Sequence, residues 1–220
     1  MNNHDKEDRD AVKKLIVGMS GSSGVIYGIR LLEILKTISG VETHLVMSPY
    51  ARLNVSIETP YDAEYVEGLA DELHSYRNQA ASISSGSFKT DGMVVAPCSM
   101  KTLSAIVHSY ADSLLVRAAD VVLKERRPLV LMPRESPLHV GHCKLLYEAA
   151  QLGAVISPPM PAFYTQPETI DDLVNHSVGR ILDLFDLDAG VIKRWKGRTG
   201  PSATKEDLPA PQAEPQRTVK

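Results

Sequence analysis

A glycine- and serine-rich turn, SGSSG at residues 20–24, connects a short apolar run to an amphipathic stretch. Glycines allow the backbone to turn tightly and to approach a ligand closely. The free N–H groups of a first helical turn, together with three serine hydroxyls, can hold a phosphate. The glycines lack the GxGxxG spacing, and such a turn can also serve only as a helix N-cap. We favour phosphate binding over the simple cap.

The second apolar run, THLVM at residues 43–47, ends at Ser48. A fold that binds a dinucleotide usually has an Asp or Glu at this point, which binds the adenosine ribose. A hydroxyl suits a second phosphate contact instead, and this favours a mononucleotide such as FMN over NAD. Taken alone, a serine in this place is more often the N-cap of the following helix.

The third apolar run is followed by PCSMKT at residues 97–102, a turn with two hydroxyls and an amine at the start of a predicted helix. A second anion site and an ordinary cap with a solvated lysine fit this pattern equally well. Cys98 is expected to pack in the core rather than to act as a nucleophile, because no histidine lies near it in the sequence.

Arg134 and Glu135 follow the fourth apolar run, LVLM at residues 129–132. An arginine at the end of a strand can bind a phosphate through two N–H groups, and a neighbouring carboxyl group can exchange a proton. Just upstream, Arg117, Asp120 and Lys124 fall on one face of a predicted helix. Such a row is more often a set of solvated ion pairs than part of a site.

Two clusters of potential metal ligands do not form a convincing metal site. His139 and His142 form an HxxH pair, but the neighbouring sequence supplies no further imidazole or carboxylate ligands. The acidic residues near the end of the last predicted helix do not form the DDxxD pair that binds magnesium in many enzymes of diphosphate substrates, and they are typical of a solvated helix end; they are Asp183, Asp186 and Asp188. We therefore expect metal-free chemistry.

Short β-branched runs alternate with longer amphipathic stretches along the chain. Consecutive apolar positions predict buried strands at residues 15–19, 43–47, 93–96, 129–132 and 154–156. Helical spacing predicts helices at residues 24–35, about 101–108, 114–124, around 143–151 and about 170–185. This order indicates an α/β fold of a single domain, a Rossmann-like parallel sheet with helices on both faces. Ligands of such folds bind beyond the carboxyl ends of the strands, where the polar turns above lie.

The composition of the 220 residues is that of a globular chain, with 43% hydrophobic and 23% charged residues. The formal net charge is −3 and no long basic run occurs, so we expect neither a nucleic acid nor a membrane as partner. The two cysteines, the absence of a secretory signal pattern and the short apolar runs predict a cytoplasmic protein. Polar residues 1–13 and proline-rich residues 197–220 are expected to be flexible tails of a domain at 14–196.

Several long motifs, in this order, are similar to those of the UbiX-type flavin prenyltransferases, relatives of the flavin-containing cysteine decarboxylases. The motifs are GMSGSSGVIYGIRLL, SISSGSF, PCSMKTLSAIVHSYADSLLVRAADVVLKERRPLVLMPRE, and AVISPPMPAFYTQP followed by a helix containing Arg180. The similarity extends from about Leu15 to Trp195. It implies a Rossmann-like subunit of a homo-oligomer, expected to be a dodecamer, with active sites at subunit boundaries.

The resemblance also implies an activity. Reduced FMN would be alkylated at N5 and C6 by dimethylallyl monophosphate, and the product, prenylated FMN, would serve a UbiD-type decarboxylase. The implied FMN contacts are Gly21, Ser22, Ser23, Ser48, Ser99, Met100, Lys101, Thr102 and Arg134. The donor phosphate would be held by residues that come in part from a neighbouring chain, namely Lys124, Arg134, Tyr164 and Arg180. Glu58 and Glu135 would be the acid/base pair, and Ser23 would assist proton movement.

Two other functions remain open. An FMN-dependent cysteine decarboxylase would carry a PASANT-like stretch and an active-site histidine, whereas this chain has PCSMKT and no histidine close to the first glycine loop. A non-catalytic flavin carrier would need the phosphate-binding turns but would have no use for Lys124, Glu135 and Arg180 together. The first loop reads GSSG where the prenyltransferases often have GASG, a mild difference that keeps the turn and adds a hydroxyl.

Overall fold

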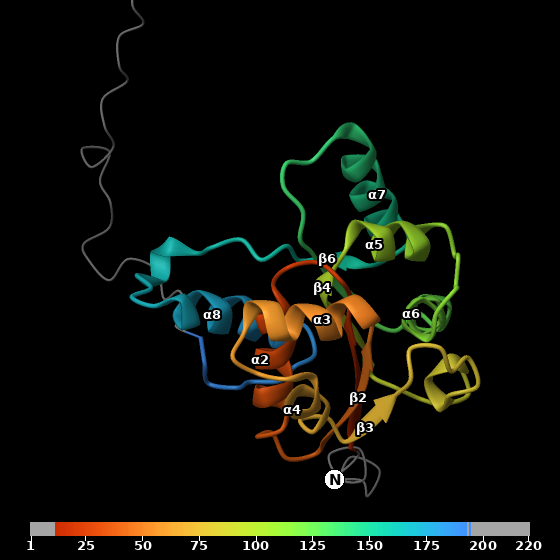
Figure 1. Cartoon of the computed structure of the whole chain (residues 1–220), viewed down its shortest axis with the longest axis horizontal. Helices are drawn as coiled ribbons and strands as arrows, with labels where there is room; N and C mark the ends of the chain where they lie inside the picture. The colour runs from red at the N-terminus through yellow and green to blue at the C-terminus, as the bar shows by residue number, and fades with distance from the viewer. Residues whose placement is uncertain (1–11, 193, 195–220) are drawn as a thin grey trace, which may run out of the picture.

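The computed structural model describes residues 12–192 and 194, and within them the strands form one six-stranded, all-parallel sheet (Figure 1). The strand order is β3-β2-β1-β4-β5-β6, so the chain winds outward from β1 in both directions. This confirms the predicted α/β class and parallel sheet. The strands are β1 Lys13–Met19, β2 Val41–Met47, β3 Glu72–His74, β4 Gly92–Cys98, β5 Leu129–Pro133 and β6 Val155–Ile156.

Serine and threonine side chains cap many of the helices that connect these strands. The helices are α2 Val25–Leu35, α3 Pro49–Glu58, α4 Ala63–Glu67, α5 Met100–Val107, α6 Leu114–Lys124, α7 Val140–Gln151 and α8 Ile170–Asp183. Two short 3₁₀ turns, η1 Ser82–Ser84 and η2 Phe163–Thr165, complete the described part. Ser48, Ser99 and Ser113 cap α3, α5 and α6, and Thr169 with Asp172 forms a capping box at α8.

Both faces of the sheet are covered, and the central strands are therefore apolar at consecutive positions. Successive side chains of a strand point to opposite faces. In β5, for example, Val130 and Met132 pack into the core formed with α2 and α8. Leu129 and Leu131 pack into the second core, against α5 and α6. The sheet therefore lies between two helical layers (Figure 1).

The predicted strands and helices are all present, with differences at their ends. The predicted ranges also lack α3, although Ser48 was expected to cap a helix there. The helix at 114–124 has the predicted bounds, whereas α7 begins earlier, at Val140, because the side chain of His139 caps its first turn. The sequence pattern did not predict α4, which has five residues, or β3, an edge strand of three largely exposed residues. The tails expected at 1–13 and 197–220 lie largely outside the described residues.

The packing of the cysteines and the length of the helices bear on two further predictions. Cys98 is fully buried in the sheet, as expected, and burial raises the pKa of its thiol to about 12. A thiol in this state is a poor nucleophile at neutral pH. Cys98 and Cys143 are both free. Among the described residues, none of the helices is sufficiently long and apolar to span a bilayer.

Candidate active site

The turns after β1, β2, β4 and β5 meet at the carboxyl edge of the sheet, where a parallel sheet binds its ligands. We call residues 20–24, Ser48, residues 99–102 and Arg134 the anion cradle. Ser20 joins two of these turns, because its Oγ donates to the Pro97 carbonyl (3.0 Å) and accepts from the Ser99 N–H (2.7 Å). The cradle is therefore assembled by contacts between segments that lie far apart in the sequence.

Ser22 supplies the observation that best indicates a ligand. Its side chain is 8% exposed, and its Oγ has no hydrogen-bond partner among the described residues. A buried hydroxyl without a partner costs free energy unless a ligand or water satisfies it. Gly24, two residues later, has a φ of 98°, a left-handed conformation that glycine adopts without strain. The loop thus fits a group rich in acceptor oxygens, such as a phosphate.

Glu58, at the end of α3, reaches the same loop. Its Oε2 accepts hydrogen bonds from the N–H groups of Gly24 (2.7 Å) and Val25 (3.3 Å), at the N-terminus of α2. These first-turn N–H groups were expected to face a phosphate, but here they bind a carboxylate. A carboxylate is favourable at this place because the helix dipole is positive there. The contact places an acid/base group at the cradle, although 34 residues separate it from Gly24 in the sequence.

Ser48 and Ser99 both act as helix caps. Ser48 Oγ accepts from the Ala51 N–H (3.1 Å), and Ser99 Oγ accepts from the Thr102 N–H (3.3 Å). The alternative of an N-cap is therefore confirmed for both residues. A cap does not exclude a ligand, because a hydroxyl oxygen has two lone pairs and one proton. Their contacts with FMN, and those of Met100, Lys101 and Thr102, stay predictions.

Arg134 connects β5 to the first loop. Its Nε donates to the Ser23 carbonyl (3.2 Å), and its own N–H donates to the Cys98 carbonyl (3.2 Å). The guanidinium thus lies beside the first loop and retains donors for an anion. Glu135 is exposed, and its Oε1 accepts from the Ser136 N–H (3.0 Å). The structure brings Arg134 together with Ser23, as the resemblance implies.

Lys124 lies away from the anion cradle. It ends α6 and forms an ion pair with Glu125. Since α6 leads into β5, Lys124 lies at the amino edge of the sheet, and the five residues of β5 span about 16 Å to the cradle. The expected row of ion pairs on α6 is present only in part, because Arg117 pairs with Asp120 (2.8 Å) whereas Lys124 does not join them.

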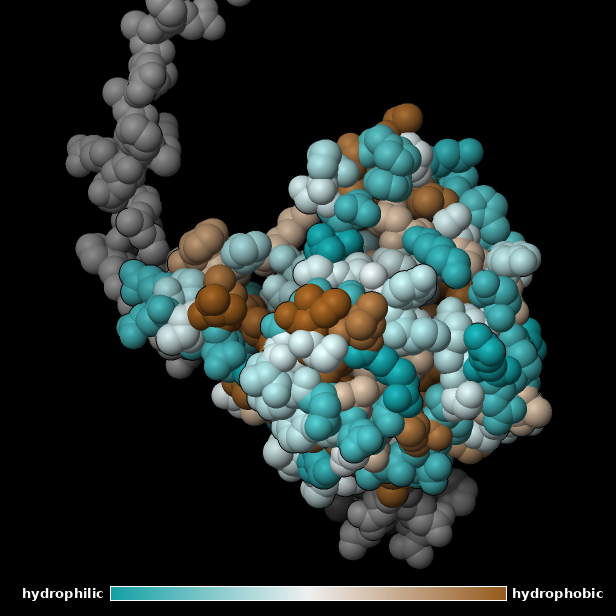
Figure 2. Space-filling view, in the orientation of Figure 1, coloured by the Kyte–Doolittle hydropathy of each residue, from teal (hydrophilic) through white to brown (hydrophobic). Residues whose placement is uncertain are grey.

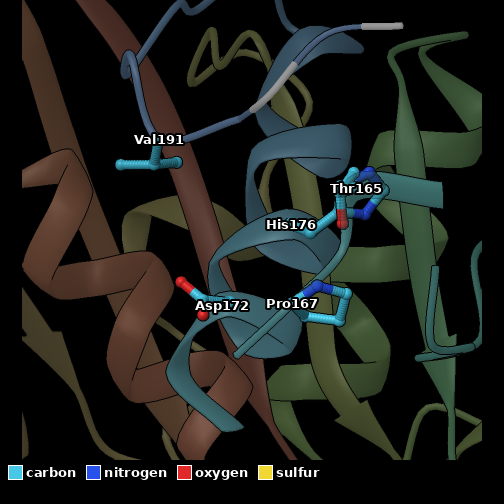
Figure 3. A pocket seen from close by; sticks show the side chains of 5 residues that line it. All are labelled: Thr165, Pro167, Asp172, His176 and Val191. Atoms are coloured by element: carbon cyan, nitrogen blue, oxygen red, sulfur yellow. The ribbon is translucent and has the colours of Figure 1, made fainter. Parts of the chain in front are cut away.

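Tyr164 and Arg180 lie on η2 and α8, the segments that follow the sheet. Tyr164 Oη lies 2.9 Å from His176 Nε2, and Arg180 donates to Asp183 (2.5 Å). Figure 3 shows His176 in the wall of a small pocket beside Thr165, the last residue of η2. His176 was not among the predicted site residues. Its spacing of four residues from Arg180 on one helix was the available signal.

Of the three acidic residues expected at a solvated helix end, Asp186 and Asp188 are exposed as predicted, whereas Asp183 differs. The side chain of Asp183 is only 18% exposed and pairs with both Arg180 and Arg194. Its bond to Arg194, followed by the charges of both arginines, lowers the pKa of this carboxyl below its usual value, against the opposing effect of burial. Within residues 12–192 and 194, no group of three or more His, Cys, Asp or Glu side chains is arranged to hold a metal ion.

A polar cradle at the carboxyl edge of a doubly wound parallel sheet, with a hydroxyl that has no partner among the described residues, is typical of proteins that bind nucleotides, flavoproteins among them. The comparison with family models agrees, because residues 3–182 match the model described as Flavoprotein. Solved FMN-dependent cysteine decarboxylases such as TvaF share this fold, with a TM-score of 0.55, but are only 17% identical over 67% of the chain. Their likeness indicates the fold alone.

Much closer relatives identify the family. The flavin prenyltransferase UbiX of Salmonella typhimurium is 59% identical over 188 residues, which is 84% of this chain and 100% of the relative. The structure of AnUbiX (PadA1) in complex with FMN and dimethylallyl pyrophosphate has a TM-score of 0.83 and 50% identity, covering 84% of this chain and 98% of that one. The chain belongs to the UbiX family of flavin prenyltransferases, which confirms the resemblance drawn from its motifs.

One further structure is informative about assembly. It is described as a dodecameric FMN-dependent Ubix-like decarboxylase from Escherichia coli, with a TM-score of 0.82 and 54% identity, and it covers 84% of this chain and 100% of that chain. The flavin prenyltransferase UbiX of Escherichia coli is 58% identical over 188 residues, again 84% of this chain and 100% of the relative. The function of this chain is therefore that of a transferase that prenylates a flavin.

Proposed function

We propose that the enzyme transfers the dimethylallyl group of dimethylallyl monophosphate to N5 and C6 of reduced FMN, which yields prenylated FMN and inorganic phosphate. The observation that carries this proposal is the buried Oγ of Ser22, which has no hydrogen-bond partner among the described residues and lies in a loop that fits a phosphate. A relative with 50% identity binds FMN and a dimethylallyl diphosphate in its crystal structure, which supports the same pair of ligand classes here. Reduced FMN supplies two nucleophilic atoms, N5 and C6.

The cradle residues bind FMN and hold its isoalloxazine ring in one orientation. Ser22 Oγ donates to the FMN phosphate, and Gly21 gives the backbone room to approach it. Ser48 and residues 99–102 extend the polar surface beyond the ends of β2 and β4. Arg134, already bonded to the Ser23 carbonyl, faces the same loop. Because these turns are held together by hydrogen bonds, they orient FMN before the prenyl donor binds, which lowers the entropic part of the activation barrier for prenyl transfer.

The remaining polar residues act on the donor and on protons. Cleavage of the allylic carbon–oxygen bond leaves its electron pair on the departing phosphate, so cations must lie beside that group. We assign the positive charges to Arg134, Lys124 and Arg180, and a hydrogen bond to the phosphate to Tyr164. We call Lys124, Tyr164 and Arg180 the donor residues. Glu135 protonates the leaving phosphate, and Glu58 accepts the proton displaced from C6, with Ser23 assisting its transfer.

The position of Lys124 supports a site shared between copies of the chain. Within one chain it lies about 16 Å from the cradle edge, so it can reach the donor phosphate only from a second copy. An apolar surface is available for such contact. Tyr50, Leu53 and Ile57 form an exposed stripe on α3, at 71%, 52% and 68% exposure, and Figure 2 shows this apolar patch over α3. Residues spaced by three and four positions share one helix face.

We therefore propose a homo-oligomer, and a dodecamer is supported by the dodecameric relative. Mass photometry or light scattering of the purified protein tests this state directly. We further propose that the product is handed to a UbiD-type decarboxylase, since prenylated FMN is useful only to an enzyme that binds it. Free Cys98 and exposed, free Cys143 support a reducing compartment such as the cytoplasm.

Anaerobic incubation with reduced FMN and dimethylallyl monophosphate tests the activity. The prenyltransferase reaction predicts a flavin heavier by one five-carbon unit and the release of one phosphate per flavin. A cysteine decarboxylase predicts an unmodified flavin in this incubation, and carbon dioxide only in a separate incubation of the FMN-loaded protein with a peptide that ends in cysteine. A flavin carrier predicts tight binding with neither product. An unmodified flavin after prolonged incubation would refute the proposal.

A further inference from the structure

The first turn of the anion cradle packs against one side of α3. Tyr50, Asn54 and Glu58 follow one another at intervals of four residues, which places them along the same side of the helix. A Cβ atom on Gly21 would lie 2.5 Å from the Cβ of Tyr50, so only a glycine allows the turn to come this close. One helical turn further on, Asn54 Nδ2 donates to the Ser22 carbonyl (3.2 Å). Asn54 therefore contacts the residue whose hydroxyl best indicates a ligand.

Two successive carbonyl groups of this turn are bound by side chains from different elements. The Ser22 carbonyl accepts from Asn54 on α3, and the Ser23 carbonyl accepts from Arg134 after β5. A carbonyl oxygen carries partial negative charge, so it would repel a phosphate that it faced. Each oxygen is instead directed to an N–H donor of the protein. The turn thus directs its carbonyl oxygens to protein donors and leaves its own donors for a ligand.

The bond from Asn54 fixes the orientation of the peptide between Ser22 and Ser23. This peptide is trans, so its N–H, which belongs to Ser23, points away from the carbonyl that Asn54 binds. Among the described residues, neither the Ser23 N–H nor the Ser22 Oγ has a hydrogen-bond partner. The N–H groups at the start of α2, in contrast, are occupied by Glu58. The donors that remain for an anion are therefore the Ser22 hydroxyl and the Ser23 N–H.

We propose that Asn54 is a positioning residue for FMN: its amide holds the Ser22–Ser23 peptide so that the Ser23 N–H and the Ser22 hydroxyl both donate to the FMN phosphate. Hydrogen bonds to a charged phosphate are stronger than those between neutral groups. Because the bond from Asn54 exists before FMN binds, the ligand does not bear the cost of orienting the peptide. The inference rests on the proposed function in one respect, namely that FMN binds in the cradle.

Riboflavin separates this role from general packing, because it carries the same ring system as FMN and lacks the phosphate. Asn54→Ala is expected to raise the dissociation constant of FMN about three- to tenfold and that of riboflavin less than twofold, as measured by quenching of flavin fluorescence. A general loosening of the site would weaken both ligands alike. Ser56→Ala is the matched control on the same helix, because its hydroxyl donates only to the Leu53 carbonyl. It should change neither constant.

A second variant keeps the size of the side chain. Asn54→Leu has no donor, so it is expected to match Asn54→Ala in its selective loss of FMN affinity. If Asn54→Ala fails to fold, as judged by its melting curve, Asn54→Leu decides by the same comparison. Equal losses for FMN and riboflavin, or an unchanged FMN affinity, would overturn the inference. Because the role concerns binding, kcat at saturating FMN should change less than twofold. A fall in kcat without a change in affinity would also overturn it.

The same measurements distinguish this failure from failure of the proposed function. If the unmodified enzyme binds FMN more tightly than riboflavin but does not prenylate it, the proposed reaction is wrong, and the Asn54 variants still test the positioning role. If the unmodified enzyme prenylates FMN and the Asn54 variants bind FMN as the parent does, only the positioning role is wrong. Equal affinity of the unmodified enzyme for FMN and riboflavin would refute a phosphate site in the cradle and the role of Asn54 with it.

Discussion

The anion cradle and the donor residues differ in how they are held. In the cradle, bonds connect separate segments: Ser20 joins the turns after β1 and β4, and Arg134 joins β5 to the first loop. The donor residues are exposed, and their bonds are more local. Lys124 pairs with the adjacent Glu125, and Arg180 pairs with Asp183 on its own helix. Under the proposed function, one chain therefore forms the flavin site, and a second copy completes the donor site.

The largest effect is expected for the residues proposed to transfer protons, because their loss should lower kcat without weakening FMN binding. Glu135→Gln keeps the size and exposure of the side chain but removes the acid. We expect kcat to fall about 10²- to 10⁴-fold while FMN affinity stays unchanged, because the cradle does not depend on this carboxyl. Product formation by mass spectrometry and FMN fluorescence titration measure the two quantities. Glu64→Gln, on the distant α4, is the control. Unchanged turnover would remove Glu135 from the mechanism.

Mixed oligomers test whether the cradle and the donor residues of one site come from different copies of the chain. Lys124→Ala and Arg134→Ala should each reduce prenylation by about 10²-fold, since each removes a cation from the leaving phosphate. If Lys124 comes from a neighbouring copy, unfolding and co-assembling the two inactive variants creates some intact sites. In an equal mixture, half of the copies keep Arg134 and the other half keep Lys124. A site is intact only when each residue comes from a copy that keeps it, so random pairing predicts about a quarter of the unmodified activity.

The control for this experiment replaces a lysine outside the site. Lys36→Ala, which removes a bond to the Gly68 carbonyl at the C-terminal end of α2, should leave activity unchanged alone and in mixtures. Mixtures of Lys124→Ala and Arg134→Ala that stay as inactive as either variant would show that both residues act within one chain. That result would contradict the shared donor site.

A smaller effect is expected inside the cradle itself. Ser22→Ala removes the buried hydroxyl that lacks a partner, so the free protein loses little while the FMN complex loses a bond to a charged group. We expect the dissociation constant of FMN to rise about tenfold or more, with a melting temperature of the free enzyme equal to or above that of the parent. Ser56→Ala, which loses only a bond to the Leu53 carbonyl, is the control. Unchanged FMN affinity would place the phosphate elsewhere.

The sheet was predictable from the sequence because its strands are buried on both faces. Runs such as Leu129–Met132 are apolar at every position, and in a chain with amphipathic helices between the runs this pattern is typical of strands in a covered parallel sheet. The edge strand β3 was not predictable, since Glu72 and Leu73 are exposed and three residues carry no period. Short elements of this kind depend on the neighbouring strand rather than on their own sequence.

The candidate site was predictable in part, and the part that was missed is tertiary. The turns of the anion cradle follow from the rule that ligands bind beyond the ends of parallel strands. The contact of Glu58 with the N-terminus of α2 was not predicted, because a sequence motif does not show which helix N-terminus a distant carboxylate will bind. The separation of Lys124 from the cradle could have been predicted from the order of the elements in the sequence. A helix that precedes a strand ends at the amino edge of the sheet.

The smallest predicted effect lies outside the site, in a histidine pair formed by buried His44 on β2 and half-buried His74 on β3. His44 Nδ1 lies 3.0 Å from His74 Nε2, their rings stack with centroids 5.3 Å apart, and Phe88 packs against His44. Burial is the main cause that lowers the pKa of both rings. Glu42, which pairs with Lys14, opposes this shift at His44, and Glu72 opposes it at both. The folded protein therefore prefers both histidines neutral.

This preference makes stability depend on pH. The unfolded chain takes up protons on these histidines as the pH falls below about 6.5, whereas the folded chain resists until lower pH, so unfolding becomes easier. The slope cannot exceed about 1.4 kcal/mol per pH unit for each histidine. We expect the melting temperature to fall between pH 7 and pH 5, and His74→Phe to make this fall shallower. His108→Phe, at the exposed end of α5, should leave the slope unchanged. Identical slopes for the parent and His74→Phe would show that the pair does not couple folding to protonation.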